Sequence, residues 1–296
     1  MLTWDLNGRR YDLGERTHIM GVLNVTPDSF SDGGRFLAPD DALRHGLGMV
    51  RDGADMLDIG GESTRPRGGS YGEGAIPVSV QEETDRVVPV IERLRGETDV
   101  PLSIDTTKSA VAEAALKAGA NIVNDVSGMR VDERMPQVAA AAGASVILMH
   151  TSGSPRTMQS KTAYTDLFGE ISDYLRAAGD LAARAGIRQI MVDPGIGFGK
   201  TVTDNLRLIL GIGRFRELGY PVLVGPSRKA FIGEVTGLPV GERLEGTIAA
   251  VVAAVLGGAH MVRVHDVLPV ARAARVADAL AHAATRPDNT SLQQRS

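Results

Sequence analysis

One pattern recurs eight times along the sequence: a short apolar run that ends abruptly in polar residues. In six of these runs a glycine stands first, as in GADMLDIGGEST at 53–64 and GAHMVRVHD at 258–266. Glycine is favoured at the left-handed residue just past a helix, and uninterrupted apolar runs are typical of parallel strands buried on both faces. The eight runs are 18–24, 53–64, 100–106, 119–128, 143–150, 186–195, 219–229 and 258–266.

Segments with helical spacing separate the apolar runs, for example at 79–94, 109–119 and 205–219. Strands that alternate with helices predict right-handed crossovers onto one parallel sheet. Eight such units in about 250 residues are typical of an α/β fold of the (β/α)8 TIM barrel type. A doubly wound open sheet is the alternative.

The two ends of the chain carry separate signals. Asn7-Gly8 stands between alternating residues and predicts an N-terminal β-hairpin, which we expect to close the bottom of the barrel. The polar segment 285–296 is expected to be a disordered tail, and 1–284 to form a single domain.

Composition narrows the setting. The chain has 296 residues, of which 43% are hydrophobic, so it can bury a large core. Its net charge of -4, with acids and bases interspersed, predicts no nucleic-acid partner. It has no cysteine, which excludes disulfides and thiolate metal sites. With a charged N-terminus and no apolar stretch of membrane-spanning length, we expect a cytoplasmic protein without a membrane partner.

Polar side chains gather where the predicted strands end, which in such barrels is the end that carries the active site. Any single one is explained by capping of the next helix. That explanation weakens for Asp105, Asn124 and Asp193 together, because all three would face one pocket. The polar strand ends are Asn24, Glu62, Asp105, Asn124, Asp125, His150, Asp193, Ser227, Lys229, Arg263 and His265.

The charges at these strand ends are divided between two sides. Lys229 and Arg263 follow the last two strands, where these barrels often hold phosphate. The acceptors Asp105, Asn124 and Asp193 lie on other strands. Since cations donate and carboxylates only accept, the pocket suits a ligand with a phosphate at one end and N–H donors at the other. The alternative is that Arg263 forms a buried ion pair with an aspartate that only stabilises the barrel.

Three further segments bear on the site. The stretch DPGIGFGKT at 193–201 falls one residue short of phosphate-loop spacing and predicts a tight turn that brings Phe198 over the site. The long loops 26–38 and 63–79 suit lids or binding elements, although loops without function are the alternative. The six histidines have no metal-ligand spacing, so no zinc site is expected.

Eight motifs occur in a fixed order: GVLNVTPDSFSDGG, DIGGESTRP, SIDTTK, IVNDVSG, LMH, DPGIGFGK, GPSRK and GAHMVRVHDV. Together they resemble the dihydropteroate synthase family, in its bacterial single-domain form, from about residue 18 to residue 284. The resemblance implies a (β/α)8 barrel, usually a homodimer, that takes small-molecule substrates. Members join 4-aminobenzoate to 6-hydroxymethyl-7,8-dihydropterin diphosphate, release pyrophosphate and 7,8-dihydropteroate in folate biosynthesis, and are sulfonamide targets.

The same resemblance assigns roles to the strand ends. It implies that Lys229, Arg263 and His265 are catalytic and that Asn24 helps to hold Mg²⁺ on the diphosphate. Asp105, Asn124 and Asp193 would bind the pterin ring. Lys229 would contact both the pterin and the side of the substrate at which the transfer takes place. Of the remaining substrate-binding residues, one group belongs to the motifs that bind the diphosphate: Thr64, Arg263, Val264 and His265. The other group shapes the aminobenzoate pocket: Arg65, Pro66, Phe198 and Ser227.

The implied mechanism is loss of the diphosphate to leave a pterin-methyl cation, which the aromatic amine attacks. This requires stabilisation of the departing anion and exclusion of water, but no nucleophilic side chain. Three alternatives remain. A pterin-binding methyltransferase barrel does not explain SRK and RVHD, a non-catalytic paralogue does not need Asn24, Lys229 and Arg263 together, and an unrelated phosphate-binding isomerase does not explain the ordered motifs.

Overall fold

Eight parallel strands form a closed barrel. The computed structural model describes residues 2–6, 8–25, 39–62, 77–153 and 162–285. In these ranges one sheet has the strand order β8-β7-β6-β5-β4-β3-β10-β9, and a bridge between Val192 and Val222 joins its two outer strands. The predicted (β/α)8 barrel is confirmed, and the open-sheet alternative is wrong. The strands are β3 (His18–Asn24), β4 (Met56–Gly60), β5 (Leu102–Asp105), β6 (Ile122–Asp125), β7 (Ser145–Met149), β8 (Ile190–Asp193), β9 (Leu223–Val224) and β10 (Met261–Val264).

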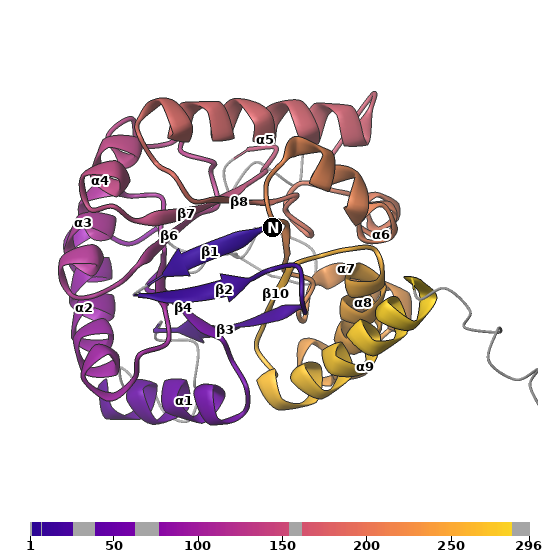
Figure 1. The fold of residues 1–296 in the computed structure, drawn as a ribbon, viewed down its shortest axis with the longest axis horizontal. Helices are drawn as coiled ribbons and strands as arrows, with labels where there is room; N and C mark the ends of the chain where they lie inside the picture. The colour runs from indigo at the N-terminus through magenta and orange to yellow at the C-terminus, as the bar shows by residue number, and fades with distance from the viewer. Residues whose placement is uncertain (1, 7, 26–38, 63–76, 154–161, 286–296) are drawn as a thin grey trace, which may run out of the picture.

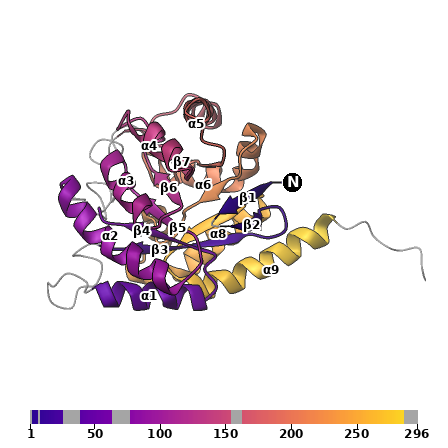
Figure 2. The same ribbon diagram turned by 60° about the vertical axis from the view of Figure 1, so that its left-hand side comes forward.

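Helices surround the barrel (Figures 1 and 2). The predicted helices at 79–94 and 109–119 correspond to α2 and α3, but the one predicted over 205–219 is divided at Gly211. A Cβ at Gly211 would lie 2.5 Å from the Phe168 ring, so only glycine permits this packing. The helices are α1 (Pro39–Arg51), α2 (Val80–Glu97), α3 (Ser109–Lys117), α4 (Met135–Ala141), α5 (Leu167–Arg184), α6 (Val202–Leu210), the 3-10 helix Ile212–Leu218, α7 (Ala230–Thr236), the 3-10 helix Val240–Glu242, α8 (Leu244–Leu256) and α9 (Val267–Thr285).

Glycines set the turn from helix to strand, as the sequence pattern predicts. All six glycines that lead the apolar runs have positive φ, between 64° and 115°, which other residues adopt only with strain. They are Gly53, Gly119, Gly143, Gly186, Gly219 and Gly258.

Side chains alternate between the two faces of each strand. Outward side chains pack against the helices and form the larger core, for example Leu57, Ile104 and Val123, none of which is exposed. Inward side chains fill the barrel. Its lower interior is apolar, whereas the polar strand ends lie at the opposite, C-terminal end of the strands.

The N-terminal hairpin closes the bottom of the barrel, as the sequence predicts. Strands β1 (Thr3–Leu6) and β2 (Arg9–Asp12) pair antiparallel with Leu6 opposite Arg9, and Gly8 has φ 72°. Figure 1 shows this hairpin lying across the barrel. Its buried side chains, Trp4 and Leu6, belong with Leu13 to one apolar cluster that also contains the inward side chains Met20, Met56, Ile122, Ile147, Met191, Leu223 and Met261.

We expect Trp4→Ala to lower the free energy of unfolding by about 3–5 kcal/mol, because Trp4 is 2% exposed and its removal opens the barrel bottom. Urea titration followed by circular dichroism measures the change. Leu210→Ala is the control: Leu210 is 75% exposed, so its loss changes stability by about 0.5 kcal/mol or less. Equal unfolding midpoints for the two variants would contradict a structural role for the hairpin.

Two predictions from the sequence extend beyond these elements. The single domain over 1–284 with a disordered tail at 285–296 stays a prediction, since 286–296 lie outside the described residues. Among the helices that the structure describes, none is both long and apolar enough to cross a membrane.

Candidate active site

Neighbouring strands end in register at the top of the barrel. Asn24 lies opposite Gly60, Gly60 opposite Asp105, and Asp105 opposite Asn124. Gly60 leaves space at this level: a Cβ there would be 3.6 Å from Asn24 Oδ1 and 3.7 Å from Asp105 Oδ2. The register therefore brings the polar ends of β3, β5 and β6 side by side.

Three predicted acceptors are buried at this level. Asp105, Asn124 and Asp193 are each 6% exposed or less. Burial raises the pKa of Asp105 to about 7, although the nearby Arg263 opposes the rise. Burial also raises the pKa of Asp193 to about 6, against the backbone N–H of Gly195, which donates to its Oδ1 at 2.7 Å. The site thus holds two carboxyl groups that become ionised close to neutral pH.

Arg263 forms ion pairs with two carboxylates. Its Nε donates to Asp58 Oδ2 at 2.6 Å and its Nη2 to Asp105 Oδ2 at 2.7 Å. Burial opposes the charge, but the two carboxylates raise the pKa of Arg263. The buried ion pair that the sequence analysis considered as an alternative therefore exists. It lies inside the candidate site, so the same contact also positions the guanidinium beside the three acceptors.

Lys229 is enclosed by the turn that follows β8. Its Nζ lies 4.0 Å from the centre of the Phe198 ring, a cation–π contact. Its stem passes Gly197, where a Cβ would lie 2.9 Å from Lys229 Cδ. Burial lowers the pKa of Lys229 to about 8, against the attraction of Asp193 and Asp105. The predicted tight turn is present, and it brings Phe198 against the lysine.

Ser227 and His265 are joined across β9 and β10. Ser227 Oγ accepts from the His265 backbone N–H at 3.2 Å and lies 2.9 Å from His265 Nδ1. Burial and the neighbouring cations lower the pKa of His265 to about 3, so the ring is neutral. In the tautomer in which the serine hydroxyl donates to Nδ1, the ring proton is at Nε2, where it can be donated to a ligand.

Not every residue expected at the site has its side chain there. The Val264 side chain is fully buried in the outer core among the helices, since it alternates with the inward-facing Arg263 and His265. Thr64, Arg65 and Pro66 lie outside the described residues, as do loop 26–38 and most of loop 63–79.

Two buried side chains at the site, Asp58 and Lys200, were not among the residues predicted from the sequence. Asp58 is fully buried in β4 and binds both Arg263 and Asn124. Lys200 is buried behind Phe198 and donates to Phe198 O at 2.9 Å and to His150 Nδ1 at 3.0 Å. Asp58 could have been identified from the sequence, because it is an acidic residue inside an apolar run. For Lys200 the sequence offered only the resemblance of its segment to a phosphate loop.

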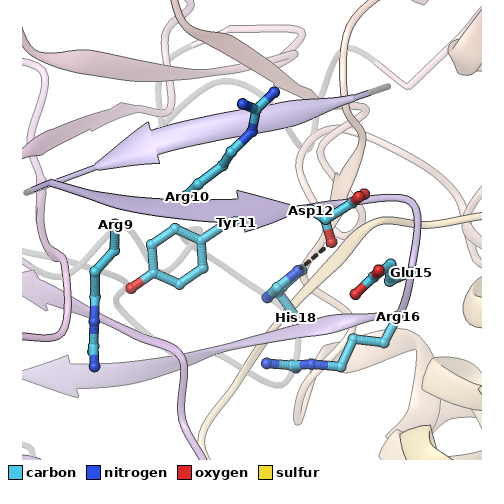
Figure 3. Close-up of a pocket in the computed structure, with 7 residues that line it drawn as sticks. All are labelled: Arg9, Arg10, Tyr11, Asp12, Glu15, Arg16 and His18. Carbon is cyan, nitrogen blue, oxygen red and sulfur yellow. Dashed lines mark hydrogen bonds between the residues drawn. The ribbon is translucent and has the colours of Figure 1, made fainter.

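A hollow at the other end of the barrel is separate from this site. It has a volume of about 370 Å³ and is lined by residues of the hairpin and of the start of β3 (Figure 3). His18 Nε2 lies 3.0 Å from Asp12 O at its edge. None of the residues predicted from the strand ends lines it. The lining residues are Arg9, Arg10, Tyr11, Asp12, Glu15, Arg16 and His18.

The site therefore combines buried acceptors with cations. Asp105, Asn124 and Asp193 can accept N–H donors of a planar heterocycle, while Lys229 and Arg263 can bind an anion that departs from it. In the described part of the chain, no group of three or more His, Asp or Glu side chains is placed to hold a metal ion.

Comparisons with known proteins agree with this chemistry. The family model described as "Pterin binding enzyme" matches residues 20–265. A dihydropteroate synthase from a Synechocystis species is 49% identical, over 91% of this chain and 92% of the relative. A dihydropteroate synthase from Clostridium difficile, solved in the presence of pteroic acid, is 45% identical with a TM-score of 0.83, covering 91% of this chain and 98% of that one.

A dihydropteroate synthase from Xanthomonas albilineans, solved with 4-aminobenzoic acid, has a TM-score of 0.86 and is 42% identical, covering 96% of this chain and 99% of that one. The likeness therefore extends from motif order to overall fold. With a pterin-binding family model over most of its length and relatives close to half identical, the chain belongs to the dihydropteroate synthase family of transferases.

Proposed function

We propose that this chain joins 4-aminobenzoate to 6-hydroxymethyl-7,8-dihydropterin diphosphate and releases 7,8-dihydropteroate and pyrophosphate. One observation carries the proposal: three buried acceptors lie at one level of the barrel, beside two cations. The acceptors are Asp105, Asn124 and Asp193, and the cations are Lys229 and Arg263. Acceptors match the N–H groups of a pterin, and cations match a diphosphate. The relatives solved with pteroic acid and with 4-aminobenzoic acid support the same pair of substrates.

The described residues supply the functions that the reaction needs. Arg263 and the Nε2–H of His265 bind the diphosphate and stabilise the charge that develops as the carbon–oxygen bond breaks. Lys229 contacts the pterin and the side of the substrate at which the transfer takes place. Phe198 and the stem of Lys229 line the site with apolar surface that helps to exclude water from the pterin-methyl cation. The amine nitrogen of 4-aminobenzoate then forms the new carbon–nitrogen bond with its lone pair and gives up a proton to water or to the released pyrophosphate.

The donor set fits Mg²⁺ bound mainly through the diphosphate. Asn24 offers an amide oxygen at the end of β3, next to Asp105 across Gly60. Mg²⁺ usually keeps several waters and is bound through few protein oxygens, most often one or two carboxylates, together with substrate phosphates, so Asn24 would add one ligand to those from the diphosphate. When bound, Mg²⁺ neutralises charge on the departing diphosphate.

Three further assignments rest on the family. Thr64 contacts the diphosphate, and Arg65, Pro66 and Ser227 shape the aminobenzoate pocket. Val264 takes part through its backbone, because its side chain faces away from the barrel interior. The cytoplasmic location and the absence of a nucleic-acid partner stay predictions.

The chain acts as a homodimer in this proposal. Support comes from apolar side chains exposed on the last two helices, α8 and α9. Analytical ultracentrifugation tests the assignment. The exposed side chains are Leu256, Leu268, Val276 and Leu280.

Incubation of the purified chain with both substrates and Mg²⁺ tests the activity, with the product identified by mass. We expect 7,8-dihydropteroate. Release of the hydroxymethyl pterin alone would mean that water captures the cation, and recovery of both substrates unchanged would favour the non-catalytic paralogue.

Binding of the pterin should depend on pH. We expect the affinity for 6-hydroxymethyl-7,8-dihydropterin to fall roughly 10²-fold or more between about pH 8 and about pH 5. The reason is that Asp105 and Asp193, with pKa raised to about 7 and about 6, take up protons in this range and lose acceptors that the ring N–H groups need. This ligand lacks the diphosphate, so phosphate titration does not contribute. Isothermal titration calorimetry measures the profile.

The matched control is Asp105→Asn, whose amide oxygen accepts at every pH. Its affinity should depend on pH only near pH 6, where Asp193 titrates. An affinity of the unaltered protein that does not change from about pH 8 to about pH 5 would show that these carboxyl groups do not accept from the ring.

A further inference from the structure

Asp58 lies where it can act on the site without touching the substrate. It is in the middle of β4, opposite Ser103 of β5, and none of its surface is exposed. Gly60, two residues further along the same face, is the residue of β4 that reaches the level of the acceptors. A buried carboxylate is costly unless donors satisfy it. In the described structure Asp58 Oδ1 has no hydrogen-bond partner, so the donors that offset this cost all lie at Oδ2.

The first partner is the side-chain amide of Asn124. Asn124 Nδ2 donates to Asp58 Oδ2 at 2.8 Å. A flipped amide would place Asn124 Oδ1 against a carboxylate oxygen, and two acceptors facing each other cannot form a hydrogen bond. Asp58 therefore determines which end of the amide is used internally. It leaves Oδ1, the acceptor end, for the pocket, and no donor from the described residues bonds to that oxygen.

The second partner is Arg263, and it uses the same oxygen. Arg263 Nε donates to Asp58 Oδ2 at 2.6 Å, while its Nη2 reaches Asp105. Asp58 Oδ2 thus accepts one donor from β6 and one from β10. Because Asp58 binds Nε from inside the barrel, the Nη groups of Arg263 are directed to the level of Asp105, where the substrate is expected.

We propose that Asp58 is a positioning residue that fixes the Asn124 amide with its oxygen toward the pterin ring. This inference rests on the proposed function. Asp58 contributes specificity indirectly: with the amide held in one orientation, the pocket presents only acceptors to the ring at Asn124 and rejects heterocycles that carry an acceptor there.

Two substitutions separate the hydrogen bond from packing and charge. Asp58→Leu keeps a side chain of similar size but offers no acceptor, so the Asn124 amide is free to turn. Asp58→Asn removes the charge and keeps an oxygen, which the Arg263 Nε–H draws to the position of Oδ2. Ser103→Ala is the matched control, because Ser103 is equally buried, lies opposite Asp58, and its hydroxyl has no hydrogen-bond partner in the described structure.

The test measures the dissociation constant of 6-hydroxymethyl-7,8-dihydropterin by calorimetry, after circular dichroism shows that each variant is folded. We expect Asp58→Leu to weaken binding at least about tenfold, and Asp58→Asn and Ser103→Ala to stay within about threefold of the unaltered protein. In a double-variant cycle, Asp58→Leu should weaken binding by less than about threefold in a protein that already carries Asn124→Leu.

Three results would overturn the proposal: normal binding by folded Asp58→Leu, equal losses in Asp58→Leu and Asp58→Asn, or losses that multiply in the double variant. The last would mean that Asp58 does not act through Asn124. A purely structural role would lower stability in both Asp58 variants without rescue by asparagine. Failure of the unaltered protein to bind the pterin would instead contradict the proposed function itself.

Discussion

Replacement of Lys229 by alanine is expected to lower kcat by roughly 10²–10³-fold while the protein stays folded, because it removes a cation aimed at the reacting substrate. Lys229 Nζ lies against the Phe198 ring and within the field of Asp105 and Asp193, and burial holds its pKa at about 8. Among the described residues no carboxylate is hydrogen-bonded to Lys229, so the side chain contributes little to stability and its removal should not destabilise the barrel.

Steady-state kinetics with both substrates measure the effect. Lys117→Ala is the control, since Lys117 is an exposed lysine of α3 whose ion pair within the described residues is with Glu113 on the same helix. It should leave kcat unchanged. A Lys229→Ala enzyme that is folded and as active as the Lys117 variant would remove Lys229 from the reaction.

Arg263→Gln is expected to lower kcat/KM by roughly 10²–10³-fold and to shift pterin binding to higher pH. The first effect follows from loss of a guanidinium that binds the diphosphate. The second follows because Arg263 lowers the pKa of Asp105, so its removal raises that pKa further above its present value of about 7. Asp105 then stays protonated, and unable to accept at both oxygens, over a wider pH range.

The two effects are measured separately, by kinetics with the diphosphate and by calorimetry with the pterin alcohol across pH. Arg16→Gln is the matched control: Arg16 also pairs with an aspartate, Asp55, but its side chain is half exposed and lies at the bottom of the barrel. An Arg263→Gln profile that coincides with that of Arg16→Gln would show that the ion pair with Asp105 does not tune the site.

Much of the fold was predictable because it depends on local signals. Parallel strands buried on both faces give continuous apolar runs, and the glycine that leads six of the eight runs marks a backbone with positive φ, so both features can be read from the sequence. The hairpin was predictable from Asn7-Gly8 for the same reason. The division of the helix at Gly211 was not predicted. The ring of Phe168, from another helix, packs closely against this glycine, and such a contact cannot be read from the local sequence.

The candidate site was predictable only as far as residues at strand ends show it. Asp105, Asn124 and Asp193 stand where apolar runs stop, so their convergence follows from the barrel. Asp58 precedes the end of its run by two residues, and its role depends on partners 66 and 205 positions away in the chain. Val264 was predicted to bind substrate because it stands between Arg263 and His265 in one motif. The alternation of side chains along a strand turns the Val264 side chain outward, and this alternation could have been applied to the sequence.

The transfer of the pterin to 4-aminobenzoate is tested by the rate of pyrophosphate release, measured with Mg²⁺ and the dihydropterin diphosphate at increasing 4-aminobenzoate. We expect slow release without the amine and a saturable rise with it, matched by an equal amount of dihydropteroate. Release that is independent of 4-aminobenzoate, or tight binding of the diphosphate without any release, would contradict this expectation.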